Sequence, residues 1–287
     1  MGDAAFPPPH ACDCHVHVIG PKTRFPLAPM RRYTPKDATV RELAGMLGRL
    51  GLERVVLVQP SFYATDNACL LDAMTRLPAA RGVAVLAPGT SPAALDALHE
   101  RGVCGLRVNI ATTGTAPLET IKDEIATAAK LCERHGWHVQ LFVAAAAIEP
   151  LAPILKALPV DSVFDHFGLI APDDASGALR ALQDLLAGGK TWVKISAAYR
   201  ISEDASDPRI GPLARALCDA NPERIVWGTD WPHTPRHHLH RGRRDEELPF
   251  RPMDTRGLMN LVPRWLKDDA LVQRVLVDNP AKLYDFS

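Results

Sequence analysis

The chain of 287 residues lacks a net charge, since 33 Lys and Arg residues balance 33 Asp and Glu residues. This balance gives no electrostatic reason to expect a nucleic acid or an anionic membrane as partner. No apolar run reaches the ~18 residues of a membrane-spanning helix. The first ten residues also lack the basic-then-apolar pattern of a signal peptide. We therefore expect a cytoplasmic protein.

Two further patterns are missing. The six cysteines show no paired CxxC spacing, which argues against a structural zinc site, and in a cytoplasmic chain they are expected to be reduced and mostly buried. No glycine-rich phosphate loop follows the first apolar run, which lowers the expectation of nucleotide binding. A hydrophobic content of 47% is ordinary for a globular protein with a sizeable core.

Short apolar runs alternate with helical patterns along the chain. Within 40–50, for example, Leu43, Met46, Leu47 and Leu50 recur at helical spacing before Gly51. Further helical patterns cover 92–102, 117–135, 178–186 and 213–219. The predicted strands are 11–19, 54–58, 83–87, 103–108, 138–143, 162–166, 191–195 and 225–228.

Continuous apolar strands that alternate with helices predict an α/β protein with a parallel sheet covered on both faces. Eight such units predict a (β/α)8 TIM barrel formed by a single domain over 1–287, with a doubly wound open sheet as the alternative. The irregular segments 21–36, 110–117 and 232–252 would then follow strands one, four and eight, on the catalytic face. The role of the His- and Arg-rich stretch 233–244 stays open.

The first strand carries Asp13-Cys14-His15-Val16-His17. Because strand side chains alternate between faces, His15 and His17 share one face and can reach a common point. Cys12 and Cys14 point to the other face and are assigned to packing. A lone His-x-His pair is explained equally well by structure or by function.

Two later strands end in polar residues. The sixth ends in Asp165-His166-Phe167-Gly168, which alone is better explained as a turn cap with a surface histidine. The eighth ends in Gly228-Thr229-Asp230, followed by Trp231-Pro232-His233. An isolated Asp230 could also be a turn cap. Its convergence with histidines at one barrel mouth favours a general base or a metal ligand.

These motifs together resemble the amidohydrolase superfamily, and within it the branch of 2-pyrone-4,6-dicarboxylate lactonase and 4-sulfomuconolactone hydrolase. Three further stretches carry the resemblance to that branch, which spans nearly the whole chain. They are Ile19-Gly20-Pro21 with Arg24-Phe25-Pro26, Val58-Gln59-Pro60-Ser61 with Thr65-Asp66-Asn67, and Leu276-Val277-Asp278-Asn279-Pro280.

The resemblance implies a catalytic site of His15, His17, His166 and Asp230. Asp230 would take a proton from water, and the histidines would polarise the substrate carbonyl, directly or through a metal that all four residues bind. One divalent metal, zinc first, is therefore expected, while a metal-free mechanism stays open. The fourth and fifth strands carry no lysine that could bridge two metals, which disfavours a binuclear site.

Arg107 and Arg200 are expected to bind a substrate carboxylate, since the resemblance gives them this role and a guanidinium suits bidentate contacts. A salt bridge within the barrel is the alternative for Arg107. Tyr199 is either a packing residue or a hydrogen-bond donor. The residues after strand two that are expected to line the pocket are Gln59, Ser61 and Tyr63, whereas Asn67 fits turn chemistry equally well.

The chain departs from the pyrone lactonase pattern in two places. The second arginine expected shortly after Arg107 is absent from 110–114, and Phe142 stands where a tyrosine is expected. The pocket thus lacks one cation and one donor, which favours a monoanionic lactone or one with a different second anion. The basic loop 236–244 either supplies the missing charge or is simply solvated.

The predicted function is hydrolysis of a carboxylated lactone from aromatic-ring or sugar-acid catabolism, by attack of a water that Asp230 activates. A lactone isomerase or a non-oxidative decarboxylase on the same barrel is the enzymatic alternative. A non-catalytic binding barrel is disfavoured because the set of three histidines and one aspartate is complete. The sequence leaves the oligomeric state open, with a homo-oligomer among the options.

Overall fold

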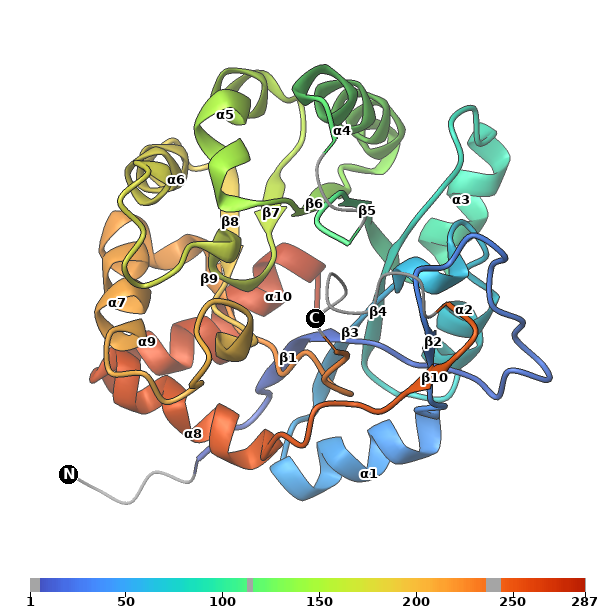
Figure 1. Cartoon of the computed structure of the whole chain (residues 1–287), viewed down its shortest axis with the longest axis horizontal. Coiled ribbons are helices and arrows are strands. Elements are labelled where there is room, and N and C mark those ends of the chain that lie inside the picture. Colours follow the sequence, from blue (N-terminus) through green and yellow to red (C-terminus); the bar gives the residue numbers. More distant parts are fainter. Residues whose placement is uncertain (1–5, 113–115, 236–243, 287) are drawn as a thin grey trace.

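The structure is a computed structural model, and it describes residues 6–112, 116–235 and 244–286. Eight parallel strands stand in a ring with helices around the outside (Figure 1). In order around the ring they are β1 (Cys12–Val16), β3 (Arg54–Val58), β4 (Ala80–Ala84), β5 (Val103–Asn109), β6 (His138–Phe142), β7 (Ser162–Phe164), β8 (Thr191–Lys194) and β9 (Ile225–Val226). This order confirms the predicted (β/α)8 barrel.

Hydrogen bonds between β1 and the segment after β9 close the ring, which excludes an open doubly wound sheet. The amide of Cys14 donates to the carbonyl of Trp227 at 2.9 Å, and the amide of His17 donates to that of Trp231 at 2.8 Å. Gly228 permits this approach, because a Cβ there would lie 2.6 Å from the backbone nitrogen of His15.

The helices cover the outer face of the ring (Figure 1). In α1, the side chain of Thr39 caps the first turn together with Glu42, and Gly51 ends the helix in the left-handed conformation. The apolar face of α1 is buried as its spacing predicts. The helices are α1 (Val40–Leu50), α2 (Ala68–Met74), α3 (Pro92–Glu100), α4 (Leu118–Cys132), α5 (Ile148–Ala157), α6 (Ala178–Ala187), α7 (Ile210–Ala220), α8 (Thr255–Leu266), α9 (Asp269–Gln273) and α10 (Asn279–Tyr284).

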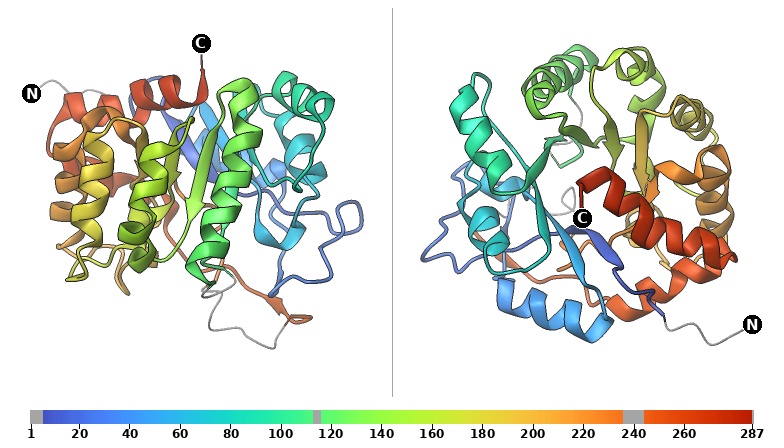
Figure 2. Two further views of the ribbon diagram at one scale, coloured as in Figure 1. Left: turned by 90° about the horizontal axis from the view of Figure 1, so that it is seen from above. Right: turned by 180° about the vertical axis from the view of Figure 1, so that it is seen from behind.

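The two ends of the barrel differ. At the amino end of the strands, α10 lies across the opening (Figure 2), and the Tyr284 ring packs 5.5 Å from the ring of His138, the first residue of β6. At the carboxyl end, β2 (Thr34–Pro35) pairs with β10 (Glu247–Leu248). This pairing holds the segments that follow strands one and eight over the carboxyl end of the barrel. Among the described residues, no helix is both long and apolar enough to cross a membrane.

The predicted strand boundaries need correction in several places. The third barrel strand is β4, Ala80–Ala84, rather than 83–87. It ends early because the side chain of Asn67 accepts a hydrogen bond from the Val85 amide and donates one to the Val85 carbonyl. Asn67 therefore takes part in turn chemistry. Strands one, six and eight are shorter than predicted, because β1 ends at Val16, β7 at Phe164 and β9 at Val226.

Asp13 ties the first strand to the last. Its carboxylate accepts hydrogen bonds from the Thr229 amide at 2.9 Å, the Thr229 hydroxyl at 2.6 Å and the His15 amide at 3.2 Å. Burial raises the pKa of Asp13 to about 7, although these donors favour the ionised form. Asp13 therefore supports the backbone that carries the residues after β9.

We expect Asp13→Ala to lower the free energy of unfolding by about 3 kcal/mol, because it leaves buried donors without an acceptor. Asp13→Asn should lose less than about 1 kcal/mol, since an amide resembles the protonated carboxyl group in shape and keeps one acceptor oxygen. Urea unfolding measures both values. Equal stability of Asp13→Ala and the wild type would contradict the role assigned to this side chain.

Candidate active site

The four residues expected to be catalytic meet at the carboxyl end of the barrel. His15 lies on β1, His17 follows β1, His166 follows β7 and Asp230 follows β9. All four side chains are buried. The Oδ1 atom of Asp230 lies 3.7, 3.5 and 3.7 Å from the Nε2 atoms of His15, His17 and His166. One carboxylate oxygen thus faces three imidazole nitrogens.

The backbone at two of these residues is unusual. His166 and Asp230 have φ angles of 49° and 63°, in the left-handed region that non-glycine residues rarely adopt. His166 lies shortly after β7 and Asp230 shortly after β9, and their side chains approach each other, with Nε2 of His166 3.7 Å from Oδ1 of Asp230. Strain of this kind persists only where the surrounding structure supports it, and it clusters at functional sites.

A second partner holds each imidazole through its Nδ1 atom. The Nδ1 of His17 lies 2.7 Å from the Val58 carbonyl oxygen. The Nδ1 of His15 lies 3.2 Å from Oδ1 of Asp165. The Val58 carbonyl only accepts, so the Nδ1 of His17 carries a proton. The Nδ1 of His15 also lies 3.5 Å from Nζ of Lys194, but its contact with the Asp165 carboxylate is shorter and favours a proton on Nδ1 and a lone pair on Nε2. The Nδ1 of His166 lies 2.9 Å from the Ser196 hydroxyl.

The two oxygens of Asp230 have different surroundings. Oδ2 accepts hydrogen bonds from the Tyr199 hydroxyl at 2.8 Å and from Nε of Arg200 at 2.7 Å. Oδ1 and the Nε2 of His15 are buried and have no hydrogen-bond partner within the described part of the chain. Buried polar atoms are nearly always paired, so these two indicate that a water or an ion belongs between them.

Burial and charge determine the ionisation states. Burial alone would raise the pKa of Asp230, but Arg200 and the surrounding histidines hold it well below its usual range. Burial lowers the pKa of His166 to about 3 and that of His15 well below its usual range. At neutral pH, the carboxylate of Asp230 therefore faces the neutral imidazoles of His15 and His166.

This donor set fits a metal ion. Ligand atoms of His15, His166 and Asp230 all lie within 4.8 Å of one another. Two imidazole nitrogens and one carboxylate oxygen are typical ligands of a catalytic zinc site with an open position. Nδ1 hydrogen bonds like those of His15 and His17 orient metal-binding imidazoles in many proteins.

A buried ionic network lies beneath the histidines. Arg107 donates from Nη2 to Oδ2 of Asp165 at 3.1 Å and from Nη1 to the Gln59 carbonyl at 3.3 Å. Lys194 donates to Oε1 of Gln140 at 2.7 Å and to the Cys14 carbonyl at 2.9 Å. In this structure Arg107 thus makes the salt bridge named as the alternative to substrate binding.

Sequence reasoning missed Asp165 and Lys194 as parts of the site. Asp165 was interpreted as a turn cap, whereas its carboxylate lies between His15 and Arg107. Lys194 is fully buried at the end of the apolar strand β8. The signal for Lys194 is the one that identified Arg107, a cation in an apolar run that needs a buried partner.

Some of the residues expected to line the pocket lie at a small cavity, and others hold nearby loops instead. A cavity of about 10 Å³, enough for one water, is lined by Ser61, Arg107, Arg200 and Phe142, together with His17 and His166. The side chain of Gln59 instead donates to the Asp66 carbonyl and holds the loop after β3. The hydroxyl of Tyr63 accepts a hydrogen bond from the Gly20 amide at 2.8 Å, and the hydroxyl of Tyr199 donates one to Oδ2 of Asp230.

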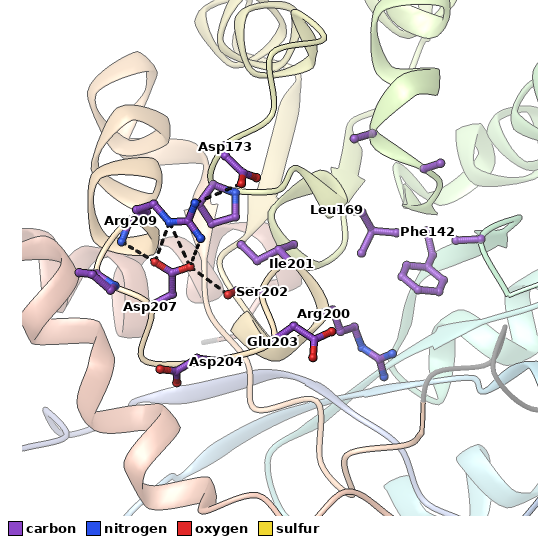
Figure 3. Close-up of a pocket in the computed structure, with 15 residues that line it drawn as sticks. Phe142, Leu169, Asp173, Arg200, Ile201, Ser202, Glu203, Asp204, Asp207 and Arg209 are labelled. Atoms are coloured by element: carbon purple, nitrogen blue, oxygen red, sulfur yellow. Dashed lines mark hydrogen bonds and ion pairs between the residues drawn. The ribbon is translucent and has the colours of Figure 1, made fainter.

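The Phe142 ring lies between the two arginines expected to bind substrate. The Cζ atoms of Arg107 and Arg200 lie 5.2 and 6.0 Å from its centre. Phe142 and Arg200 also line a larger cleft of about 990 Å³ beside the small cavity (Figure 3). Most of the basic stretch 233–244 lies outside the described residues, so its role stays untested.

The chain is similar to known proteins over nearly its whole length. The family profile described as Amidohydrolase matches residues 12–286. The chain is 34% identical to 4-sulfomuconolactone hydrolase of Hydrogenophaga intermedia over 284 residues, which cover 96% of this chain and 89% of the relative. It is also 34% identical to 2-pyrone-4,6-dicarboxylate hydrolase of Comamonas testosteroni, over 96% and 90% of the two chains.

Two more similarities are informative. D-galactarolactone isomerase of Agrobacterium fabrum is 27% identical over 98% of this chain and 92% of the relative. The crystal structure of a candidate 2-pyrone-4,6-dicarboxylic acid hydrolase from Pseudomonas putida superposes with a TM-score of 0.79 at 30% identity. That match covers 97% of this chain and 98% of the other.

We expect the metal-free protein to lose stability as the pH falls from about 6.5 to about 4.5. Burial lowers the pKa of His138 and His166 to about 3, that of His233 to about 4 and that of His15 well below its usual range, so unfolding takes up four protons in this range. Asp13 has the opposite effect, because its pKa is raised to about 7 in the folded protein and unfolding therefore releases one proton. The net slope is at most about 4 kcal/mol per pH unit. Urea unfolding at several pH values measures the slope, and stability that rises on acidification would contradict it.

Proposed function

Because the chain belongs to the amidohydrolase family, we propose that it is a hydrolase that opens a carboxylated lactone by attack of a water that Asp230 activates. One observation carries this proposal: the buried Oδ1 of Asp230, which has no hydrogen-bond partner among the described residues, faces the Nε2 atoms of three imidazoles. The names of the two hydrolase relatives support a lactone as the substrate class.

In the proposed reaction, Oδ1 of Asp230 takes a proton from water while the water oxygen bonds to the lactone carbonyl carbon. Arg200 and Tyr199 hold Oδ2, so that Oδ1 keeps its direction during the transfer. The bond between the carbonyl carbon and the ring oxygen then breaks. The ring oxygen leaves as an alcohol and receives the proton from Asp230.

The histidine tautomers favour a metal over direct polarisation of the carbonyl. With Nδ1 protonated toward Asp165, the neutral ring of His15 presents a lone pair rather than a donor to Oδ1 of Asp230. Burial disfavours the imidazolium form of His15. We therefore infer one divalent cation, zinc first, held by His15, His17, His166 and Asp230. When bound, it would supply a Lewis acid that polarises the carbonyl and acidifies water.

The substrate carboxylate is proposed to bind between Arg107 and Arg200, beside Phe142 and Ser61. All four side chains line the small cavity next to His166, which fits about one water in this structure, so a bound carboxylate requires these side chains to move apart. The Nη2 of Arg200 contacts the Thr234 hydroxyl at 3.0 Å, and substrate would compete for this contact. A guanidinium at this position offers bidentate contacts to a planar carboxylate.

A lactone isomerase is the second candidate, because one relative carries that name. Isomerisation keeps the ring closed, and non-oxidative decarboxylation releases CO₂, whereas hydrolysis consumes water and opens the ring. A non-catalytic barrel leaves the unpartnered atoms of Asp230 and His15 unexplained. Product analysis by NMR in H₂¹⁸O separates the three outcomes, since only hydrolysis leaves ¹⁸O in a ring-opened acid.

We expect Asp230→Asn to lower kcat of lactone hydrolysis by about 10²- to 10⁴-fold, because an amide cannot act as the general base. A pH-indicator screen of carboxylated lactones identifies the substrate for this comparison. Circular dichroism checks that the fold is intact, and metal analysis checks whether the variant keeps its zinc. Near-normal turnover by a folded variant would refute the role of Asp230.

We expect chelation of the metal to abolish turnover and added zinc to restore it.

Asp165→Asn should weaken zinc binding by about 10- to 100-fold, because a neutral amide attracts the proton on Nδ1 of His15 less strongly than the carboxylate does. Asp161→Asn is the matched control, since Asp161 precedes the same strand and accepts only from the Trp192 indole. Full activity after verified metal removal would overturn the metal proposal.

A further inference from the structure

His233 is a buried histidine close to Asp230 that has no part in the proposed reaction so far. The residue is only 4% exposed, and its φ angle of 66° lies in the left-handed region that non-glycine residues rarely adopt. Its amide donates to the Asp230 carbonyl at 2.8 Å, and its carbonyl accepts from the Arg251 amide at 2.8 Å. An imidazole held in an unfavourable backbone conformation beside a reacting group points to a functional role.

The imidazole of His233 connects α8 to Asp230 through three hydrogen bonds. Its Nε2 lies 2.8 Å from the hydroxyl of Thr255, the first residue of α8. Its Nδ1 lies 3.1 Å from the Tyr199 hydroxyl, which in turn donates to Oδ2 of Asp230 at 2.8 Å. His233 therefore contacts one of the two residues that hold the second oxygen of the proposed base.

The ionised state of Asp230 fixes the direction of these hydrogen bonds. Oδ2 of a carboxylate only accepts, so Tyr199 gives it the single hydroxyl proton. Toward His233 the Tyr199 oxygen can then only accept, and Nδ1 of His233 must carry a proton. Burial lowers the pKa of His233 to about 4, so the ring is neutral at pH 7 and its Nε2 accepts from Thr255.

This chain of donors affects Asp230 through the Tyr199 hydroxyl. Burial raises the pKa of Tyr199 well above its usual range, so the phenol keeps its proton and acts only as a donor. A hydrogen bond received from His233 polarises the phenol and strengthens its own donation to Oδ2. Because Nδ1 of His233 offers no lone pair, the Tyr199 proton points to Asp230 and not to the imidazole.

We propose that His233 is a positioning residue for lactone hydrolysis: its Nδ1 proton directs the Tyr199 proton onto Oδ2, and this keeps Oδ1 of Asp230 available as the base. The described lining of the small cavity does not include His233, so the residue acts through Tyr199. This inference rests on the proposed function and adds a residue to its machinery. It requires a hydrogen-bond donor at the position of Nδ1.

Three substitutions of His233 separate the roles of its two nitrogen atoms. The Nδ2 of asparagine lies as many bonds from Cα as Nδ1 of histidine does, so His233→Asn keeps a donor for Tyr199. His233→Gln carries its amide one bond farther out, in reach of Thr255, and His233→Leu removes both contacts.

In the zinc-loaded protein, His233→Leu and His233→Gln should lower kcat by about 10-fold, because each removes the buried hydrogen bond to Tyr199. KM should stay within about twofold of the wild type, since His233 does not line the described cavity. His233→Asn should keep kcat within about threefold of the wild type. A folded His233→Asn variant as slow as His233→Leu would overturn the inference.

A double-mutant cycle tests whether His233 acts through Tyr199. Tyr199→Phe removes the hydroxyl, so the addition of His233→Leu should change kcat by less than about twofold. A merely structural role of His233 predicts the same loss of about 10-fold with and without the hydroxyl. That result would overturn the inference.

His138→Leu is the matched control for the loss of a buried imidazole. The His138 ring packs 5.5 Å from the ring of Tyr284, much as the His233 ring packs 5.7 Å from that of Tyr199, but it lies at the amino end of the barrel. Urea unfolding should show lower stability in both leucine variants, whereas kcat of His138→Leu should stay within about twofold of the wild type. An equal fall in kcat in both would attribute it to destabilisation and overturn the inference.

NMR separates this inference from the proposed reaction, because it needs no substrate. In the zinc-loaded protein with ¹⁵N-labelled histidine, His233 should carry its proton on Nδ1 and none on Nε2. The signal of the Tyr199 hydroxyl proton should shift in His233→Leu and change little in His233→Asn. If the signals behave in this way while no lactone is opened, the reaction is wrong and the orienting role of His233 stands. A proton on Nε2 alone would overturn the inference even if lactones are opened.

Discussion

The site depends on one carboxylate oxygen, Oδ1 of Asp230, which lies among three imidazole nitrogens and has no hydrogen-bond partner in the described part of the chain. A buried carboxylate oxygen without a hydrogen bond costs free energy, and two sets of contacts hold it in place. Asp13 fixes the backbone after β9 through Thr229, and Arg200 and Tyr199 hold the other carboxylate oxygen. The closure of the ring between its first and last strands therefore also assembles the site.

The charged groups beneath the histidines fix the ionisation state of Asp165 and the tautomer of His15. Asp165 is an anion between His15 and Arg107, with the ammonium group of Lys194 3.8 Å away. These contacts hold the pKa of Asp165 well below its usual range even though burial alone would raise it. An anion on Nδ1 keeps His15 in the tautomer that presents its lone pair to Asp230. The proposed metal site thus has an ionic support beneath it.

The sequence could predict much of this architecture because the signals are local. Alternating apolar runs and helical spacing indicated the barrel, and polar residues at strand ends indicated which side chains meet at its mouth. The boundary of β4 could not be predicted, because it depends on Asn67, a residue distant in sequence that takes the hydrogen bonds of Val85. The partners of Arg107 and Lys194 depend on three-dimensional proximity in the same way. The catalytic and binding roles of the site residues remain predictions.

The most direct test of the account is a crystal structure of the zinc-soaked protein, with anomalous diffraction recorded on both sides of the zinc absorption edge. The account predicts one strong peak within bonding distance of Oδ1 of Asp230 and of the Nε2 atoms that face it. Imidazole rings rotated away from Asp230, or zinc bound only elsewhere on the protein, would contradict it.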